Sequence, residues 1–399
     1  MVDSIIKQCV QKSDGIDHLS HLKTQWQDAN WPTSKQEIWR YAKLHWLNEA
    51  WLLASQSGKD IAYDAVLSQY NLELKETDLV SVEGQFLPRE INGVNYFSAD
   101  ALNANDMTWS DDFFNQLGCL GLNDWANIEV APGQQLDSQW HCILDQAKGW
   151  QNLKLTIHVK KDAHLRLRMN VMAAQAVTNL SLNVKVEQGG SCQIVSWASP
   201  QSKLIIDHNI DLQDRSEFRY DALNFEASWC HERIHMTVGA HANAMLSGLL
   251  LPGKGQSDHK AIHVHHIAPS GQSMQKFYSV ADANGLAAFH GRAIVGQTAP
   301  KTNARQLARA LMLSKACEVY SRPELEIDID DVQCQHGSSI GELDQKALFY
   351  LRSRGISLDE AKSMLIHGFI EEVVTELDPV IQSWVRDRIG SHAIGRGEA

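Results

Sequence analysis

The chain has 399 residues, of which 44% are apolar and 21% charged, and its formal net charge at pH 7 is −12. This length predicts two or three domains, and the composition is that of a globular protein. The negative charge, without a cluster of Lys and Arg, argues against a nucleic-acid partner, because phosphate binding requires basic groups that displace counterions.

Membrane insertion and disulfide bonding are not expected. No apolar run in the sequence approaches the roughly 18 residues that a membrane helix needs, and residues 1–19 lack a signal-peptide core, so we expect a cytoplasmic protein. The seven cysteines are Cys9, Cys119, Cys142, Cys192, Cys230, Cys317 and Cys334. Their scatter, without a C-x-x-C pair, predicts reduced thiols and excludes a self-contained zinc finger or ferredoxin motif.

Three regions differ in periodicity, and the first, residues 1–124, is predicted to be helical. Ser34 and Glu37 form a capping box before an aromatic-rich helix that contains Trp39. We interpret the many Trp and Leu residues that follow as core packing of a helical lobe.

Residues 125–338 are predicted to form a β core. Apolar residues alternate with polar ones in three consecutive sets: Leu153, Leu155, Ile157 and Val159; Leu165, Leu167, Met169 and Val171; and Leu180, Leu182, Val184 and Val186. Each set is typical of a half-buried strand, and turn signals such as Lys161-Asp162 separate the sets. A sandwich, a barrel and a solenoid all fit this pattern, and no strict sequence repeat selects among them.

Residues 339–399 are predicted to be helical again. The first helix runs from Asp344 to a stop at Gly355, the second is capped by Ser357 with Glu360, and the third begins at Pro379 and ends at Gly390. These amphipathic helices need a surface to lie on, either the β core or another protein.

Two short motifs were weighed as binding sites. Residues 248–255 nearly match the phosphate-binding G-x-x-x-x-G-K-[ST], but Gly255 replaces the hydroxyl residue, so we expect a strand followed by a Pro-Gly turn. His263 and His265 alternate on a predicted strand and resemble a cupin-type zinc or iron site. No carboxylate ligand follows them nearby, and exposed or hydrogen-bonded histidines are the alternative interpretation.

Cys334 and His336 are the sharpest candidate ligands. The alternation of Leu325, Ile327 and Ile329 shifts by one residue after Asp330, which we interpret as a β-bulge that turns Cys334 and His336 to one face. Two ligands cannot complete a cluster site, so further ligands must come from another chain. A half-buried cysteine and a structural histidine are the alternative.

Several segments together resemble the SufB/SufD family of iron–sulfur cluster assembly proteins. They are residues 321–327 (SRPELEI), 331–337 (DVQCQHG), 341–344 (GELD), 348–356 (LFYLRSRGI), 289–295 (FHGRAIV), and Glu37 with Trp39-Arg40-Tyr41. Within that family the chain is more similar to SufD than to SufB, because Gly337 follows His336 where SufB typically has Glu, and because the chain lacks an N-terminal cysteine cluster.

The resemblance implies a mainly β fold, a right-handed parallel β-helix core between N-terminal and C-terminal α-helical regions. It implies a non-catalytic scaffold subunit that pairs with SufB and contacts the ATPase SufC. His336 matches the family's histidine at the SufB–SufD interface, where a transient iron–sulfur cluster forms, and Cys334 matches the adjacent cysteine. No cofactor is implied for the isolated chain, and the sequence leaves open a homodimer of the chain alone, iron delivery, and a flavin in the complex.

We expect the second C-terminal helix to carry the ATPase contact, because apolar anchors on one helix face commonly dock into a partner's groove. These anchors are Leu358, Ala361, Leu365 and Phe369. Two rival functions remain: a β-helix carbohydrate-active enzyme, which would need paired carboxylates near Glu326, Asp328 and Asp330, and a cupin-like metalloenzyme that uses His263 and His265.

Overall fold

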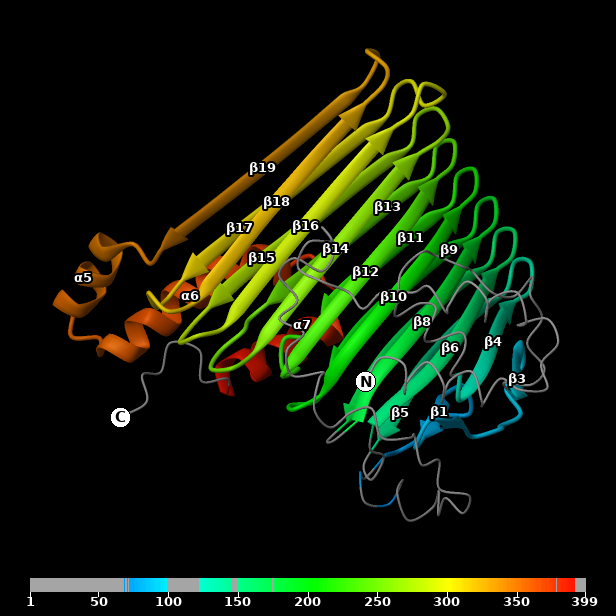
Figure 1. The fold of residues 1–399 in the computed structure, drawn as a ribbon, viewed down its shortest axis with the longest axis horizontal. Coiled ribbons are helices and arrows are strands. Elements are labelled where there is room, and N and C mark those ends of the chain that lie inside the picture. Colours follow the sequence, from blue (N-terminus) through cyan, green and yellow to red (C-terminus); the bar gives the residue numbers. More distant parts are fainter. Residues whose placement is uncertain are drawn as a thin grey trace, which may run out of the picture.

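The β core is a parallel β-solenoid of about seven turns, followed by three helices (Figure 1). The computed structural model describes residues 68, 70, 72–98, 122–144, 149–173, 176–377 and 379–391. This confirms the parallel β-helix that the family resemblance implied, and it decides among the sandwich, barrel and solenoid. The predicted capping box of Ser34 and Glu37 lies outside the described residues.

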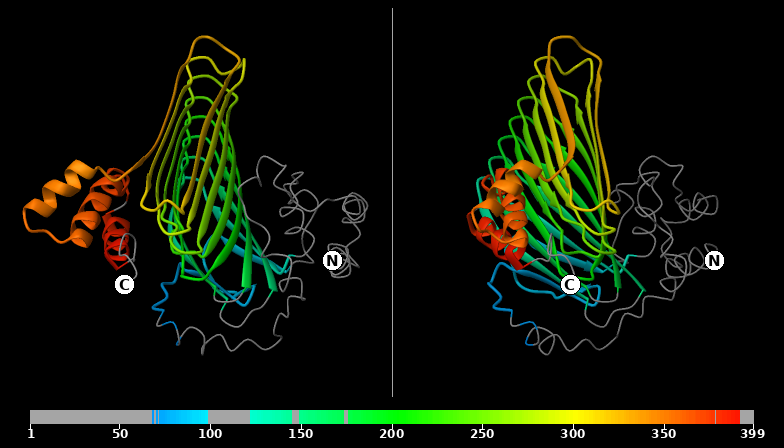
Figure 2. Two further views of the ribbon diagram at one scale, coloured as in Figure 1. Left: turned by 60° about the vertical axis from the view of Figure 1, so that its left-hand side comes forward. Right: turned by 90° about the vertical axis from the view of Figure 1, so that its left-hand side faces the viewer.

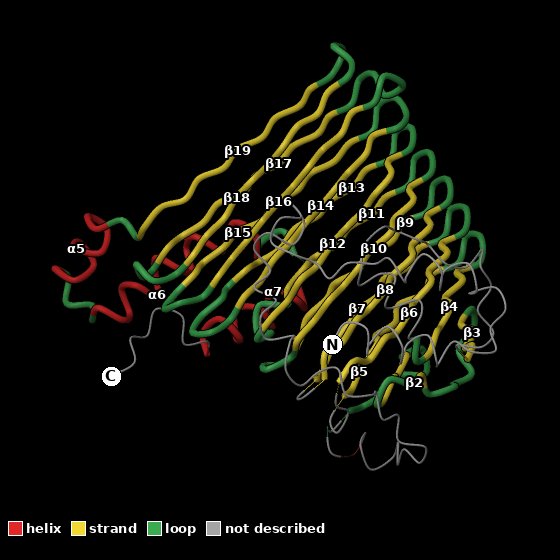
Figure 3. Tube along the Cα trace, in the orientation of Figure 1, coloured by secondary structure: helices red, strands yellow, loops and turns green. Residues whose placement is uncertain are grey.

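Each turn of the solenoid contributes one strand to each of two sheets, and loops connect them at both corners (Figure 3). Sheet A contains β1 (Leu79–Val82), β2 (Gln85–Phe86), β5 (Gln135–Leu144), β7 (His164–Ala173), β9 (Ser191–Ala198), β11 (Glu217–Leu223), β13 (Asn243–Leu250), β15 (Gln272–Ala281), β17 (Asn303–Met312) and β19 (Gln333–Glu342). Sheet B contains β3 (Val94–Ser98), β4 (Asp124–Val130), β6 (Gly149–Val159), β8 (Ala176–Val186), β10 (Lys203–Leu212), β12 (Trp229–Val238), β14 (Ser257–His266), β16 (Leu286–Val295) and β18 (Glu318–Ile327).

Residues 79–98 form three strands, although the sequence placed them in a helical region. β1 and β2 pair antiparallel through a tight turn in which Glu83 and Gly84 have φ of 51° and 81°. Two consecutive residues with positive φ make the hairpin turn that matches strand twist. β1 then pairs in parallel with β5 and so begins sheet A. The strands are short, and their apolar runs carry too few residues for a periodicity to be recognised.

The predicted alternation within strands is confirmed. In β6, β7 and β8 the apolar residues of the three sets point between the sheets and are at most 3% exposed. Register pairs stack similar aliphatic types, since Leu155 lies beside Leu182 and Ile157 beside Val184. The core is therefore a continuous apolar column along the solenoid, and each turn buries its inner face against its neighbours.

One corner of the solenoid has the same backbone conformation in successive turns, although the residue type there differs from turn to turn. A residue with positive φ stands there in successive turns: Gly133, Asp162, Gly189, Arg215, His241, Ser270 and Lys301. The amide of each donates to a carbonyl of the next turn, as in Arg215 N to Ala240 O at 2.8 Å and Ser270 N to Pro300 O at 2.8 Å. This ladder fixes the corner while tolerating almost any side chain, which explains why no sequence repeat is visible.

The three C-terminal helices are α5 (Gln345–Ser353), α6 (Leu358–Val374) and α7 (Pro379–Ser391). Asp344 caps α5, and Ser357 and Glu360 form the predicted capping box of α6. α7 continues past Gly390, which was predicted to end it. In the described ranges, no helix has the length and apolar character required to cross a membrane.

α6 and α7 cover part of the outer face of sheet A, on one side of the solenoid (Figure 2). Their buried residues include Ile366, Ile370, Val373, Ile381 and Val385, which pack on Leu223, Leu249, Tyr278 and Val280 of the sheet. Polar contacts fix the position: Lys276 Nζ donates to Glu372 O at 2.9 Å, and Tyr278 OH donates to Glu372 Oε2 at 2.5 Å. The surface that these two helices need is therefore the protein's own sheet.

Val184 tests the placement of the core. Its side chain is 3% exposed inside the apolar column, so the change Val184→Asp buries an unpaired carboxylate and should lower the free energy of unfolding by more than about 3 kcal/mol. Lys185→Asp, which places the same side chain on the outer face one residue later, should change it by no more than about 0.5 kcal/mol. Thermal unfolding followed by circular dichroism compares the two, and equal melting temperatures would contradict the assignment.

Candidate functional site

The last turn of the solenoid is its least covered part. In the portion of the chain that the structure describes, β18 pairs only with β16 and β19 only with β17, so each is an edge strand. Every described residue of these two ten-residue strands is half-buried or exposed. A long unpaired edge presents a row of free N–H and C=O groups, which is a template for pairing with another chain.

Cys334 and His336 both lie in β19, on the face that continues the interior of the solenoid. Their register partners in β17 are Ala304 and Gln306, both buried. Cys334 is half-buried, whereas His336 is exposed at the open end. The prediction that these two side chains share one face is therefore confirmed.

The expected β-bulge at Asp330 and Asp331 is wrong. β18 ends at Ile327 in sheet B, residues 328–332 form a loop, and β19 begins at Gln333 in sheet A. The change of parity marks the passage from one sheet to the other at the corner of a turn. Val332 belongs to this loop.

The thiol of Cys334 is harder to deprotonate in the chain alone than a free thiol. Burial raises the pKa of this thiol, and the Ala304 backbone hydrogen bond offsets the rise only in part. A thiol must lose its proton to bind a metal or to attack sulfur. Of the two candidate residues, we therefore place the main role on His336.

Two exposed aliphatic side chains lie on the inward face of the last turn, on either side of His336 along the strands. Ile327 in β18 is 42% exposed and Ile340 in β19 is 47% exposed, values unusual for aliphatic side chains at the end of a core. Ser338 Oγ donates to Ser321 Oγ at 2.8 Å and joins the two strands across the turn. The end of the solenoid thus combines two free strand edges, exposed isoleucines and an accessible imidazole.

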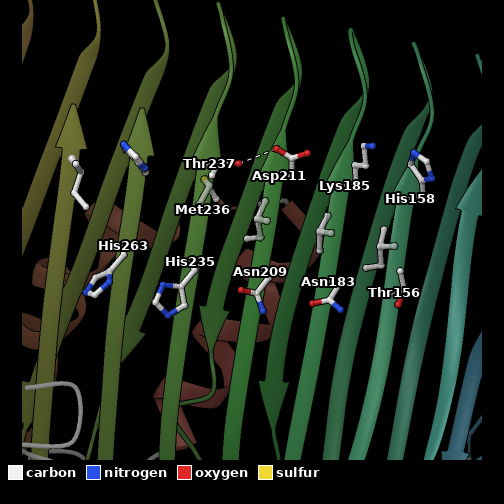
Figure 4. A pocket seen from close by; sticks show the side chains of 15 residues that line it. Thr156, His158, Asn183, Lys185, Asn209, Asp211, His235, Met236, Thr237 and His263 are labelled. Carbon is white, nitrogen blue, oxygen red and sulfur yellow. Dashed lines mark hydrogen bonds between the residues drawn. The ribbon is translucent and has the colours of Figure 1, made fainter. Parts of the chain in front are cut away.

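His263 occupies a different place, on the outer face of sheet B (Figure 4), and His265 lies two residues further along β14 on the same face. They line one end of a groove of about 610 Å³ that crosses six strands, from β6 to β16. Two polar rows run along it in register: Thr156, Asn183, Asn209, His235 and His263 in one, and His158, Lys185, Asp211, Thr237 and His265 in the other. Lys254 and Gly255, the end of the weighed phosphate motif, lie in the turn after β13, as expected.

Neither rival function finds its site in this groove. Among the described residues, no three His, Cys, Asp or Glu side chains converge as metal ligands, and a solenoid replaces the cupin barrel. Asp211 is the single carboxylate lining the groove, and it accepts a hydrogen bond from Thr237 Oγ1 at 2.9 Å. Glu326 is paired with Arg292, while Asp328 and Asp330 lie in the loop after β18. The paired carboxylates of a glycosidase are therefore not formed by these residues.

A charged cluster lies inside the solenoid, and the sequence analysis did not identify it. Lys260 Nζ lies 2.9 Å from Glu232 Oε2 and 2.8 Å from Asp258 Oδ1, and it donates to Cys230 Sγ at 3.4 Å. His208 Nε2 lies 2.9 Å from Glu232 Oε1, which also accepts a hydrogen bond from Tyr220. All these side chains are almost fully buried, so an ammonium and two carboxylates compensate each other within the core.

The two buried carboxylates differ in their protonation. Burial would raise the pKa of Glu232, but the Lys260 ammonium and hydrogen bonds from His208 and Tyr220 lower it to about 2. Burial raises the pKa of Asp258 to about 6, because Lys260 offsets the desolvation only partly. Burial also raises the pKa of the Cys230 thiol well above its ordinary value. The cluster thus holds one firm ion pair between Lys260 and Glu232, with a protonated thiol beside it.

The predicted partner-binding face of α6 is largely used within the chain. Ala361 is 0% exposed, and Phe369 packs on Tyr278 with 5.1 Å between ring centroids. Leu365 is half-buried, so only Leu358, at 40% exposed, is open to a partner. The prediction is therefore wrong for Ala361, because the same stripe that would anchor a partner buries the helix against its neighbours.

Exposed apolar side chains occur instead on α5 and the first half of α6. Phe349 is 75% exposed, Tyr350 57% and Met364 52%, and together with Leu358 we call them the α5–α6 patch. Figure 2 shows α5 as the helix furthest from the solenoid, and none of its residues is buried. The sequence pattern of α5 did not separate these residues from ordinary packing positions, because amphipathicity does not say which partner covers the apolar face.

Over the described residues the fold defines a class of β-solenoid proteins whose last turn is paired on one side only and is followed by C-terminal helices. Comparison with known proteins identifies the family. Residues 142–369 match the SufBD core domain of the SUF system for FeS cluster assembly. The chain therefore belongs to the SufBD family.

Relatives come from several bacteria. The chain is 25% identical to an iron–sulfur cluster assembly SufBD family protein of Synechocystis, over 87% of this chain and 84% of that protein. It is 26% identical to SufD of Escherichia coli, over 67% of this chain and 58% of that protein. It is 35% identical to SufD of Bacillus subtilis, over 31% of this chain and 29% of that protein. The SufD-like character inferred from the motifs is thus supported.

Asp258→Asn tests the charged cluster. The pKa of this carboxyl is about 6 in the folded protein against about 3.8 in an unfolded chain, so the folded state binds more protons between these values and the wild type loses stability as the pH rises. Asn does not titrate, and the variant should therefore gain free energy of unfolding relative to wild type between about pH 4 and pH 7. Urea denaturation across this range measures the difference, and a difference independent of pH would contradict the cluster's geometry.

Proposed function

We propose that this chain is a non-catalytic, SufD-like scaffold subunit for iron–sulfur cluster assembly. The observation that carries the proposal is the open last turn, in which two free strand edges flank His336. A finished solenoid would cap this end, since exposed edges promote aggregation. An end that combines free edges with an accessible ligand is suited to a permanent partner.

The partner is a SufB-like subunit whose own solenoid end pairs with β18 and β19. Strand addition at a free edge supplies affinity through main-chain hydrogen bonds, and Ile327 and Ile340 supply exposed apolar area toward the two ends of these strands. A second copy of this chain could use the same edges, so a homodimer of the isolated chain is the competing assembly. Mixing the two chains and measuring mass by light scattering separates the two assemblies.

His336 provides this chain's ligand to the nascent cluster, which is the cargo of the complex. A neutral imidazole binds iron, and one ligand on this chain requires the others to come from the partner. Cys334 lies two residues away on the same face and serves a secondary role because of its raised pKa. In this proposal the isolated chain holds no resident cofactor and works in the cytoplasm. Absorbance spectroscopy of the purified complex tests whether the complex contains a flavin.

The ABC-type ATPase, a SufC-like subunit, contacts the α5–α6 patch. Phe349 and Tyr350 are adjacent aromatic side chains on a projecting helix, and buried aromatics are the commonest anchors of protein interfaces. α6 connects this patch directly to sheet A through Tyr278 and Glu372. A movement of the ATPase would therefore be transmitted to the solenoid through packed contacts.

Replacing His336 with Ala tests the ligand role. The imidazole is exposed, so folding, pairing with the SufB-like chain and ATP hydrolysis should be unchanged, whereas cluster formation should fall by at least about tenfold. Anaerobic reconstitution of the complex, followed by absorbance of the cluster, measures the effect. His265→Ala on the outer face of sheet B is the matched control, and Cys334→Ser should be milder. If the His336→Ala complex forms clusters normally, His336 is not a cluster ligand, and the alternative interpretation as a structural histidine stands.

Removing the aromatic anchors tests the ATPase contact. The double change Phe349→Ala and Tyr350→Ala should weaken binding of the ATPase subunit by at least about 30-fold, since each anchor is expected to contribute more than about 1 kcal/mol. The melting temperature should not change, because neither side chain is buried in the free chain. Isothermal titration calorimetry measures the affinity, with Gln345→Ala at the start of α5 as the control. If the double variant binds the ATPase subunit as tightly as wild type does, the contact lies elsewhere on the chain.

A further inference from the structure

Two amide side chains lie in the solenoid directly behind His336. Gln275 in β15, Gln306 in β17 and His336 in β19 are register partners, and so form one row across sheet A. Neighbours in such a row are about 4.8 Å apart. In the direction away from β19, the row continues from Gln275 to Leu246 in β13, which is fully buried in the core. The row therefore leads from the apolar interior to the open end.

Both amides are buried without hydrogen-bond partners. Gln275 is 0% exposed and Gln306 is 3% exposed, and among the described residues neither the oxygen nor the nitrogen of either side chain has a partner. An unpaired buried polar group costs free energy that a leucine at the same position would avoid. These amides are therefore unfavourable for folding alone, and they stand next to the residue proposed to bind the cluster.

The facing sheet leaves room for the inner amide. Gly291 in β16 lies opposite it, and a Cβ at this position would come within 2.5 Å of Gln275 Oε1 and within 2.5 Å of the Phe289 ring. Any larger residue at position 291 would displace Gln275 from the row. The interior is thus shaped around the amide.

We infer that Gln306 is a positioning residue for His336 and that Gln275 orients Gln306 from behind. Rotations of the imidazole and of both amides about their side-chain bonds bring one ring N–H to the amide oxygen of Gln306 and the Gln306 amide nitrogen to the oxygen of Gln275. The second ring nitrogen keeps its lone pair and faces the open end. Histidines that ligate metals commonly have the other ring nitrogen held in this way, which selects the tautomer. This inference rests on the proposed function and specifies how the ligand is prepared.

No other titratable group competes for the imidazole on this face. Across the described strands β17, β18 and β19, the titratable side chains that share the inward face with His336 are Cys334 and Glu342. Glu342 is about 20 Å away along the strand. Cys334 carries a protonated thiol, because burial raises its pKa.

A spectroscopic test uses the full isolated chain with ¹⁵N-labelled histidine. The ring ¹⁵N shifts report which nitrogen carries the proton, and the spectrum of His336→Asn identifies the signals of His336. In the wild type one tautomer should dominate, and Gln306→Leu should reduce the tautomer ratio by about two- to tenfold, the range that one net hydrogen bond supports. Gln306→Glu retains an acceptor oxygen and should restore the preference.

Gln335→Leu is the matched control, because it makes the same change beside His336 but on the outer face of β19. It should leave the wild-type ratio. Gln306→Leu should fold at least as stably as wild type, since it removes an unpaired polar group, and Gln306→Met provides the same readout in a second variant. An unchanged ratio in both would overturn the relay. A shifted ratio together with normal cluster formation by His336→Ala would support the relay and reject the proposed function.

Discussion

Every turn of a parallel solenoid depends on hydrogen bonds to the turn before it and the turn after it. Within the described strands, sheet A pairs in parallel from β1 and β5 to β19 and sheet B from β4 to β18, and the positive-φ corner residues extend the same dependence into the loops. The apolar column is closed laterally by this ladder but not at its ends. Since β18 and β19 have a neighbour on one side only, the constraint that builds the fold also creates the site at its end.

The polar groups inside the solenoid change character along its axis. In the middle, Lys260 forms ion pairs with Glu232 and Asp258, so that part of this buried charge is compensated within the chain. Towards the end, Gln275 and Gln306 are buried without partners and His336 is exposed. The last turns therefore combine unpaired buried amides with an exposed imidazole. The α5–α6 patch is a second exposed surface, on the C-terminal helices.

Local patterns predicted the strands and helices well, but not the contacts between distant turns. The alternation of residues 153–186 and the capping box of Ser357 with Glu360 are local, and both are confirmed. The repeat was invisible because its corner accepts Asp, Arg, His, Ser or Lys in the same backbone conformation. The row of Gln275, Gln306 and His336 could not be found, since register joins residues about thirty positions apart. The face of α6 was misassigned because an apolar stripe does not reveal whether sheet A or another protein covers it.

The central claim is that the last turn is completed by a partner chain. Hydrogen–deuterium exchange of the backbone amides of β18 and β19 tests it most directly, in the isolated chain and in its complex with a SufB-like subunit. The account predicts that amides on the free edges exchange rapidly in the isolated chain and become at least about tenfold slower in the complex, while those of β10 and β12 do not change. Equal exchange at β18 and β19 in both samples would show that the partner binds elsewhere and would contradict the account.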